Sequence, residues 1–383
     1  MPRPGSDGDM RNSYAMIAIV VVAIIVGAGV YGVMASVHSS VTTVTTTSTA
    51  TTTVTPTETT TSTTTTSSAP STNTSLTVGI LPTADAVPFF VALHNGYFAQ
   101  EGLNITVKYM AGGAVIAPAV EQGSIQLGEG TPITLMASHE QGFDFKLVAP
   151  MSATIYPNGT QPTTYVPGVS THILGVLASS NITSWKDLAG KTVAVNTLGT
   201  FTQAALIQAL KDNGVNPSTV NIVAVSPPNW LTSLEQKRVD AIDFFEPFAT
   251  ELVIANQTAP TVGDFRILGD IANVGNVLQA GFFSTSTWIN SNPTTVASFV
   301  KAYDEGVAAA NANSTLERQM LITYLNTSSI VASKVVLFSY PTSPMPYSLI
   351  QNEIQLGLQS GLLKNPNDNA TQIVDTTYLQ LTS

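Results

Sequence analysis

Short turns at the ends of predicted strands carry the residue types that could bind a small ligand. A helix is predicted to begin in the turn Leu198-Gly199-Thr200-Phe201-Thr202. Its free backbone N–H groups and the positive end of its dipole can hold an anionic oxygen without any Arg or Lys. The turns Gly112-Gly113-Ala114 and Gly130-Thr131 offer the same groups. The alternative is that these glycines only make tight turns.

Aromatic side chains and carboxylates lie in similar turns. Trp230 and Phe201, and more weakly Phe89 and Tyr156, could stack on an apolar or planar ligand, although aromatic residues more often lie in a core. Asp85 and Glu246 could pair with a ligand amine, or could serve only as charges at helix N-termini. Two adjacent phenylalanines end a predicted strand, so one should face the core and the other the cleft. The candidate ligand-binding residues are Thr83, Asp85, Gly113, Thr131, Leu198, Gly199, Thr200, Phe201, Asn229, Trp230, Phe244 and Glu246.

Composition excludes several other kinds of site. The 383 residues contain no cysteine, which rules out a thiol nucleophile, a disulfide scaffold and a thiolate metal site. The four histidines have no ligand-like spacing, and none lies in a motif that would activate a serine. We therefore expect no enzyme activity, cofactor or metal. The net charge of −10 has the wrong sign for a protein that binds nucleic acid.

Strands alternate with helices along most of the folded part, and this pattern predicts parallel or mixed sheets covered on both faces. In open sheets of this class, ligands bind beyond the carboxyl ends of strands, where the turns described above lie. Strands are predicted at 76–81, 104–110, 125–127, 145–149, 191–195, 220–225 and 241–245. Helices are predicted at 88–100, 115–122, 131–141, 200–213, 229–238, 246–255, 294–312, 316–325, 329–338 and 347–361.

The N-terminal part of the chain has a different character. Residues 15–35 form an uncharged run of 21, long enough to cross a bilayer, within a predicted anchor or signal segment at 15–37. Arg3 and Arg11 precede the run, which predicts that residues 1–14 are cytoplasmic and the rest extracellular. A Thr/Ser-rich stalk is predicted at 38–75, either O-glycosylated or an unmodified linker. Eight Asn-X-Ser/Thr acceptors fit an exposed glycoprotein.

Three motifs over about residues 76–283 resemble the solute-binding proteins of ABC importers, in the branch for nitrate, sulfonate, taurine and thiamine-pyrimidine precursors. In order along the chain they are A-x-x-x-G-Y-F-x-x-E-G-L in VGILPTADAVPFFVALHNGYFAQEGLNITV (78–107), D-L-x-G-K in ITSWKDLAGKTVAVNTLGTFTQAALIQALKDNGV (182–215) and V-D-A-x-x-x-x-E-P in KRVDAIDFFEP (237–247). VEQGSIQLGEGTPITLMASHEQGFDFKLVA (120–149) adds to the resemblance. The order and spacing of the motifs carry it, since no single motif is diagnostic.

The resemblance implies an α/β type II periplasmic-binding-protein fold with two lobes that close on a ligand by hinge bending. Lobe 1 would hold 76–170 and 283–383, and lobe 2 would hold 171–282 with the hinge crossovers near 171–177 and 278–282. In the family the glutamate of the E-P motif often meets a ligand amine, which implies this role for Glu246. His172, in the first crossover, would pack at the hinge. The family's one enzymatic relative carries a cysteine-rich motif, so the lack of cysteine argues against that activity.

The resemblance also predicts how the protein works. It would be a monomeric receptor tethered to the extracellular face of the membrane, similar to archaeal surface forms, that hands a small polar solute to ABC permease and ATPase subunits. With Glu246 available and no Arg placed in a candidate turn, an amine-bearing or zwitterionic solute is favoured, either taurine-like or aminopyrimidine-like. The alternative is a surface glycoprotein or adhesin that uses the fold as a spacer.

Overall fold

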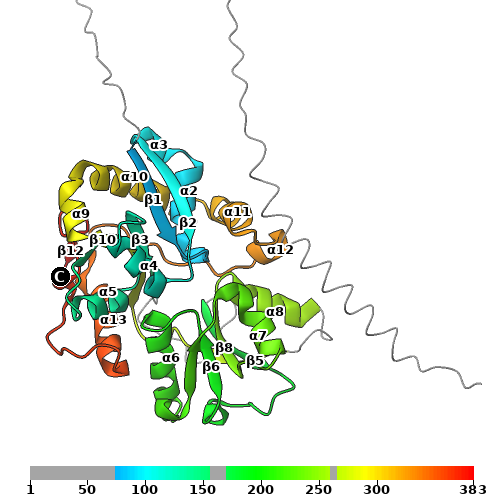
Figure 1. The fold of residues 1–383 in the computed structure, drawn as a ribbon. Helices are drawn as coiled ribbons and strands as arrows, with labels where there is room; N and C mark the ends of the chain where they lie inside the picture. The colour runs from blue at the N-terminus through cyan, green and yellow to red at the C-terminus, as the bar shows by residue number, and fades with distance from the viewer. Residues whose placement is uncertain (1–73, 156–169, 259–264) are drawn as a thin grey trace, which may run out of the picture. The chain divides into compact units, whose positions relative to one another are not determined.

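The computed structural model describes residues 74–155, 170–258 and 265–383 (Figure 1). Within these residues the strands form two five-stranded sheets and one two-stranded ladder. The predicted anchor at 15–37 lies outside the described residues, as does the predicted stalk apart from Thr74 and Ser75, which begin the first strand. In the part of the chain that is described, no helix has both the length and the apolar character needed to cross a bilayer.

The first sheet contains β1 (Thr74–Ile80), β2 (Leu103–Tyr109), β3 (Leu127–Gly130), β4 (Phe145–Thr154) and β10 (Val277–Thr285). Its strand order is β2-β1-β3-β10-β4. β1 pairs in parallel with β2 and β3, whereas β10 runs antiparallel to β3 and β4. The sheet is therefore mixed, and β10, a strand from far along the chain, lies between β3 and β4.

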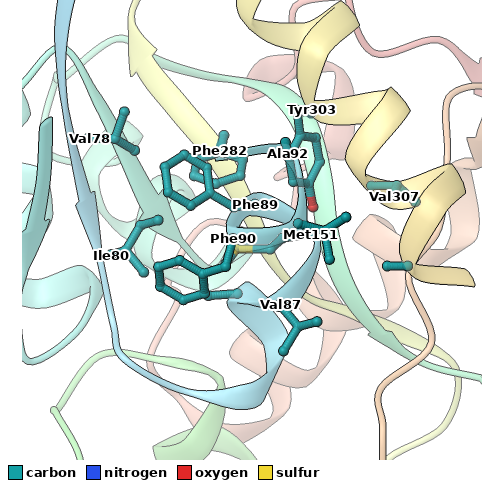
Figure 2. Packing of buried hydrophobic residues seen from close by; sticks show 14 of the residues in the cluster. Val78, Ile80, Val87, Phe89, Phe90, Ala92, Met151, Phe282, Tyr303 and Val307 are labelled. Carbon is teal, nitrogen blue, oxygen red and sulfur yellow. The ribbon is translucent and has the colours of Figure 1, made fainter. Parts of the chain in front are cut away.

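Helices cover both faces of this sheet. One face packs against α2 (Val87–His94), α3 (Tyr97–Gln100), α9 (Ser286–Ser291), α10 (Pro293–Ala312), α11 (Ser314–Leu325) and α12 (Ser329–Ala332). The other face packs against α4 (Gly113–Glu121), α5 (Pro132–His139) and α13 (Tyr347–Ser360). Neighbouring residues of one strand point to opposite faces, so Phe282 enters the first core and Phe283 the second. Figure 2 shows the first core, where Phe282 packs edge-on against Tyr303 at a centroid distance of 5.0 Å.

The second sheet contains β5 (His172–Leu177), β6 (Thr192–Val195), β7 (Asn221–Ala224), β8 (Ala241–Phe245) and β9 (Phe265–Asp270). Its order is β7-β6-β8-β5-β9, with β5 antiparallel to both of its neighbours. The helices after β6, β7 and β8 are α6 (Phe201–Asp212), α7 (Trp230–Glu235) and α8 (Phe248–Thr258). The ladder of β11 (Met345–Pro346) and β12 (Leu381–Thr382) completes the strands.

Several elements differ from the sequence-based expectation. β10 pairs with β3 and β4, so residues 277–282 belong to the first sheet, whereas they were assigned to lobe 2. β9 was not predicted. The helix predicted at 88–100 is divided between α2 and α3, because Gly96 adopts a positive φ of 74° between them. The helix predicted at 329–338 ends at Ala332.

Candidate functional site

A small cavity of about 50 Å³ lies among residues from both five-stranded sheets. A water molecule needs roughly 10–15 Å³ by this measure, so the cavity in this conformation has room for a compact polar group. The first sheet and its helices contribute Leu81, Asp85, Gly112, Gly113, Glu129, Gly130, Thr131, Gln279 and Ala280. The second sheet and α6 contribute His172, Asn196, Thr200, Phe201, Thr202 and Phe245, and Phe338 follows α12.

Two carboxylates line the first-sheet side. Asp85 lies in the short 3-10 helix η1 (Ala84–Ala86) after β1, where the Thr83 hydroxyl donates a hydrogen bond to it. Glu129 lies on β3 and is only 6 % exposed, and its Oε2 accepts the Leu81 N–H at 2.8 Å. Burial raises the pKa of Glu129 well above its usual value, and the nearby Asp85 charge raises it further. Burial likewise raises the pKa of Asp85.

A buried imidazole faces the carboxylates from the second sheet. The Nδ1 atom of His172 on β5 lies 3.3 Å from Oδ1 of Asp243 on β8, an ion pair when the histidine is protonated. Burial alone would lower the pKa of His172, but the Asp243 carboxylate raises it above its usual value, with smaller contributions from Asp270 and Asp85. His172 also contacts the rings of Phe201 and Phe245.

Hydrogen-bond donors surround the beginning of α6. The Thr202 hydroxyl donates to Asn196 Oδ1 at 2.7 Å, which leaves the Asn196 amide nitrogen as a donor beside the cavity. Thr200 is the N-cap residue of α6, but its side chain makes no capping hydrogen bond and instead donates to the Thr197 carbonyl. The first N–H groups of α6 therefore lie at the cavity without a side-chain cap.

The two sides of the cavity touch each other. The Thr134 hydroxyl of α5 donates to the Gly199 carbonyl at 3.2 Å. Gly112 has a φ of 133°, and a Cβ atom there would lie 3.0 Å from the Asn196 amide nitrogen. Glycine is thus required at 112 both by its conformation and by the close approach of the second sheet. These contacts bring the two sides together at one edge of the cavity.

The structure brings five of the predicted site residues to the cavity: Asp85, Gly113, Thr131, Thr200 and Phe201. Three others, Thr83, Leu198 and Gly199, lie within two positions of a lining residue in the chain without being lining residues themselves. Thr83 donates to Asp85, Gly199 accepts from Thr134, and Leu198 is 43 % exposed. The remaining four, Asn229, Trp230, Phe244 and Glu246, are not lining residues, although Phe244 and Glu246 flank the lining residue Phe245 in the chain.

The positions of Trp230 and Phe244 follow from the packing of the second sheet. Trp230 is 1 % exposed, donates from Nε1 to the Val225 carbonyl at 2.6 Å and packs against Phe244. Phe245, rather than Phe244, lines the cavity. Because β8 pairs with β5 in a register that sets Phe245 opposite His172, the two side chains share one face of the sheet. Asn229 is exposed and donates to Ser226.

Glu246 has an internal role in this structure. Its carboxylate is 1 % exposed and accepts hydrogen bonds from the Thr250 N–H, the Thr250 hydroxyl and the Val336 N–H. Burial raises the pKa of Glu246 to about 7 despite these donors. The side chain therefore joins the end of β8 to the segment after α12, and it is not among the residues that line the cavity.

The twelve candidate ligand-binding residues do not include Glu129, Asn196, Phe245 and Gln279, which line the cavity, and His172 was assigned only a packing role. Glu129 had a usable signal, since it stands between two glycines at the end of a predicted strand. The position of His172 depends on the pairing of β5 with β8, which no local pattern encodes. Within the described residues, no group of three or more His, Asp and Glu side chains could hold a metal ion.

Comparison with known families agrees with this architecture. A family model described as NMT1/THI5 like matches residues 83–315, which is more than half of the chain. The chain belongs to the NMT1/THI5-like family. This match confirms the resemblance that the sequence motifs indicated.

Individual relatives of this NMT1/THI5-like chain are distant. A Brachyspira hyodysenteriae protein, named as a candidate ABC transporter periplasmic binding protein, is 23 % identical over 265 residues, covering 66 % of this chain and 69 % of the relative. The taurine-binding periplasmic protein of Escherichia coli is 24 % identical over 237 residues, covering 60 % of this chain and 64 % of the relative. The alkanesulfonate-binding protein SsuA of Xanthomonas axonopodis pv. citri, solved with MOPS, has a TM-score of 0.60 at 17 % identity, covering 80 % of this chain and 98 % of SsuA. This last likeness confirms the two-sheet periplasmic-binding-protein fold.

Proposed function

We propose that this chain is the solute-binding protein of an ABC importer and captures a small polar solute in the cavity between its two sheets. The observation that carries the proposal is a partly open cavity to which both sheets contribute buried hydrogen-bonding groups. Glu129 comes from the first sheet, and His172 and Asn196 come from the second. Membership of the NMT1/THI5-like family and the names of the relatives support the same role.

The proposal extends to location and motion. Residues 15–37 would anchor the protein, and residues 38–73 would space it from the membrane. The part from Thr74 onward would lie outside the cell as a monomer that delivers solute to permease and ATPase subunits. The two lobes, each built on one of the five-stranded sheets, would open and close about the crossovers between the sheets. The solute would be taurine-like or sulfonate-like, or else aminopyrimidine-like. We propose that the protein is not an enzyme.

Ligand-dependent stabilisation tests this function. The purified full chain, kept in detergent, is screened by thermal shift against a library of small metabolites. A solute at about 100 times its dissociation constant should stabilise the protein by roughly 2.7 kcal/mol. Solution scattering should show a more compact particle with the solute bound, because both sheets would contact it. If no metabolite stabilises the protein, a surface spacer replaces the receptor as its function.

Two asparagine variants locate the site. Asn196→Ala removes a lining amide, whereas Asn229→Ala removes an exposed amide that lies away from the cavity. We expect Asn196→Ala to weaken binding of the identified solute about tenfold, a typical effect of losing one buried hydrogen bond. Asn229→Ala should bind as the unchanged protein does. The opposite pattern would mean that the solute binds outside this cavity.

A further inference from the structure

Acidic side chains outnumber basic side chains in the lining of the cavity. Asp85 and Glu129 are both carboxylates, and no Lys or Arg is among the described residues that line the cavity. His172 is the one basic side chain in that lining, and its Nδ1 atom is already paired with Asp243. When His172 is protonated, its positive charge is therefore already paired with the Asp243 carboxylate. Asp85 and Glu129 have no full counter-charge from the described part of the chain.

Glu129 also has an unused acceptor. Its Oε2 atom takes the Leu81 N–H, while its Oε1 atom has no hydrogen-bond partner among the described residues. Glu129 is only 6 % exposed, and it lines the cavity. A group inside the cavity that donates to this oxygen would add a hydrogen bond to the carboxylate and would therefore be stabilising. An anion in the same place would instead lie beside Asp85 and Glu129, each of which repels an anion when it is ionised.

The other side of the cavity offers donors. The uncapped first turn of α6, the Asn196 amide nitrogen and the His172 ring lie there. His172 Nε2 has no hydrogen-bond partner among the described residues, and with Nδ1 engaged by Asp243 it can donate when the ring is protonated. An acceptor atom of a ligand suits this side, whereas a cationic group suits the side of Asp85 and Glu129.

We propose that the solute carries a cationic nitrogen group, an ammonium or an amidinium, that lies against Asp85 and Glu129 while its acceptor atoms face the beginning of α6. The inference rests on the proposed solute-binding function and narrows it to one class of ligand. A simple oxyanion without a basic nitrogen is excluded from the class. The cavity of about 50 Å³ further favours a compact cation.

Three probes of nearly equal shape test the charge preference: acetamidinium, acetamide and acetate are cationic, neutral and anionic. Binding of each to the full chain in detergent at pH 7 is measured by calorimetry, with ionic strength matched by sodium chloride. We expect acetamidinium to bind at least about tenfold more tightly than the other two, since a charged hydrogen bond adds roughly 1.5–3 kcal/mol. Equal binding by the three probes, no binding by any of them, or tighter binding of acetate would overturn the inference.

Two variants assign the effect to the carboxylates. Glu129→Gln retains an oxygen for the Leu81 N–H but places an amide donor where Oε1 lies, and Asp85→Asn removes the second charge. Each should weaken acetamidinium binding about tenfold or more while leaving acetamide binding within about twofold. The control, Glu235→Gln, makes the same chemical change at an exposed position outside the cavity and should change nothing. If both cavity variants bind acetamidinium as the control does, the carboxylates do not hold the cation.

The proposed function and this inference fail in different ways. A library solute that lacks a basic nitrogen but stabilises and compacts the protein would leave the receptor function intact and refute the charge class. A library without any stabilising solute would refute the receptor function. Thermal melting of each variant, measured without a probe molecule, shows whether the variant is folded. A loss of binding counts as evidence only for a folded variant.

Discussion

Glu246 should make the stability of this protein fall as the pH rises through neutrality. Burial raises its pKa from 4.5 to about 7, so the folded state holds the proton more tightly than the unfolded chain does. Below pH 4.5 both states are protonated, and this contribution to stability is complete. Between pH 4.5 and 7 the unfolded chain releases the proton first, and the free energy of unfolding decreases with each step in pH.

The size of the effect follows from the pKa shift. One pKa unit corresponds to about 1.4 kcal/mol, so the shift to about 7 amounts to roughly 3 kcal/mol between the two ends of the pH window. The side chain is 1 % exposed, so solvent screening reduces this figure little. Glu246→Gln cannot ionise. Its amide oxygen can accept from the Thr250 hydroxyl and the Val336 N–H, while its nitrogen would replace the oxygen that accepts from the Thr250 N–H, a cost that does not change with pH. The variant should therefore lack this part of the pH dependence.

Urea unfolding of the full chain and of Glu246→Gln at pH 4.5, 6 and 8 measures the effect. The stability of the variant relative to the unchanged protein should rise by about 3 kcal/mol from pH 4.5 to pH 8, because other titrating groups cancel in the difference. Glu235→Gln, with an exposed carboxyl, serves as the control and should show a difference that is nearly constant with pH. A constant difference for Glu246→Gln as well would refute the burial argument.

Three further predictions concern packing and location. A Cβ atom at position 306 would lie 2.5 Å from the Pro88 carbonyl oxygen, so Gly306→Ala should lower the free energy of unfolding in urea by about 1–3 kcal/mol; an unchanged midpoint would contradict this packing of α10 on α2. Trp230→Phe should cost about 2 kcal/mol in the same assay because it removes the donor to the Val225 carbonyl and leaves a void. The full-length protein should stay with membranes after a carbonate wash, with its folded part open to external protease, and recovery of a soluble chain beginning near Ser36 would refute an anchor at 15–37.

Local sequence patterns predicted the helices and strands around much of the cavity. The alternation of apolar strands and helices predicted sheets covered on both faces, and the two sheets of the structure are covered in this way. The glycine-containing turn before residue 201 predicted a helix that begins at a ligand-facing edge, and Thr200 and Phe201 line the cavity. These features depend on residues close together in the chain, so periodicity and turn chemistry reveal them.

The sequence by itself determined the family, the order of most strands and helices, and the absence of thiol chemistry. Only the tertiary structure decided which side chains share the cavity. The choice of Phe245 over Phe244 depends on the pairing of β8 with β5, and the partner of Glu246 at Val336 lies 90 residues away. Glu129 and Asp85 meet because β3 pairs with β1. Contacts of this kind depend on the register between strands that are far apart in the chain. The spacing of neighbouring residues does not reveal that register.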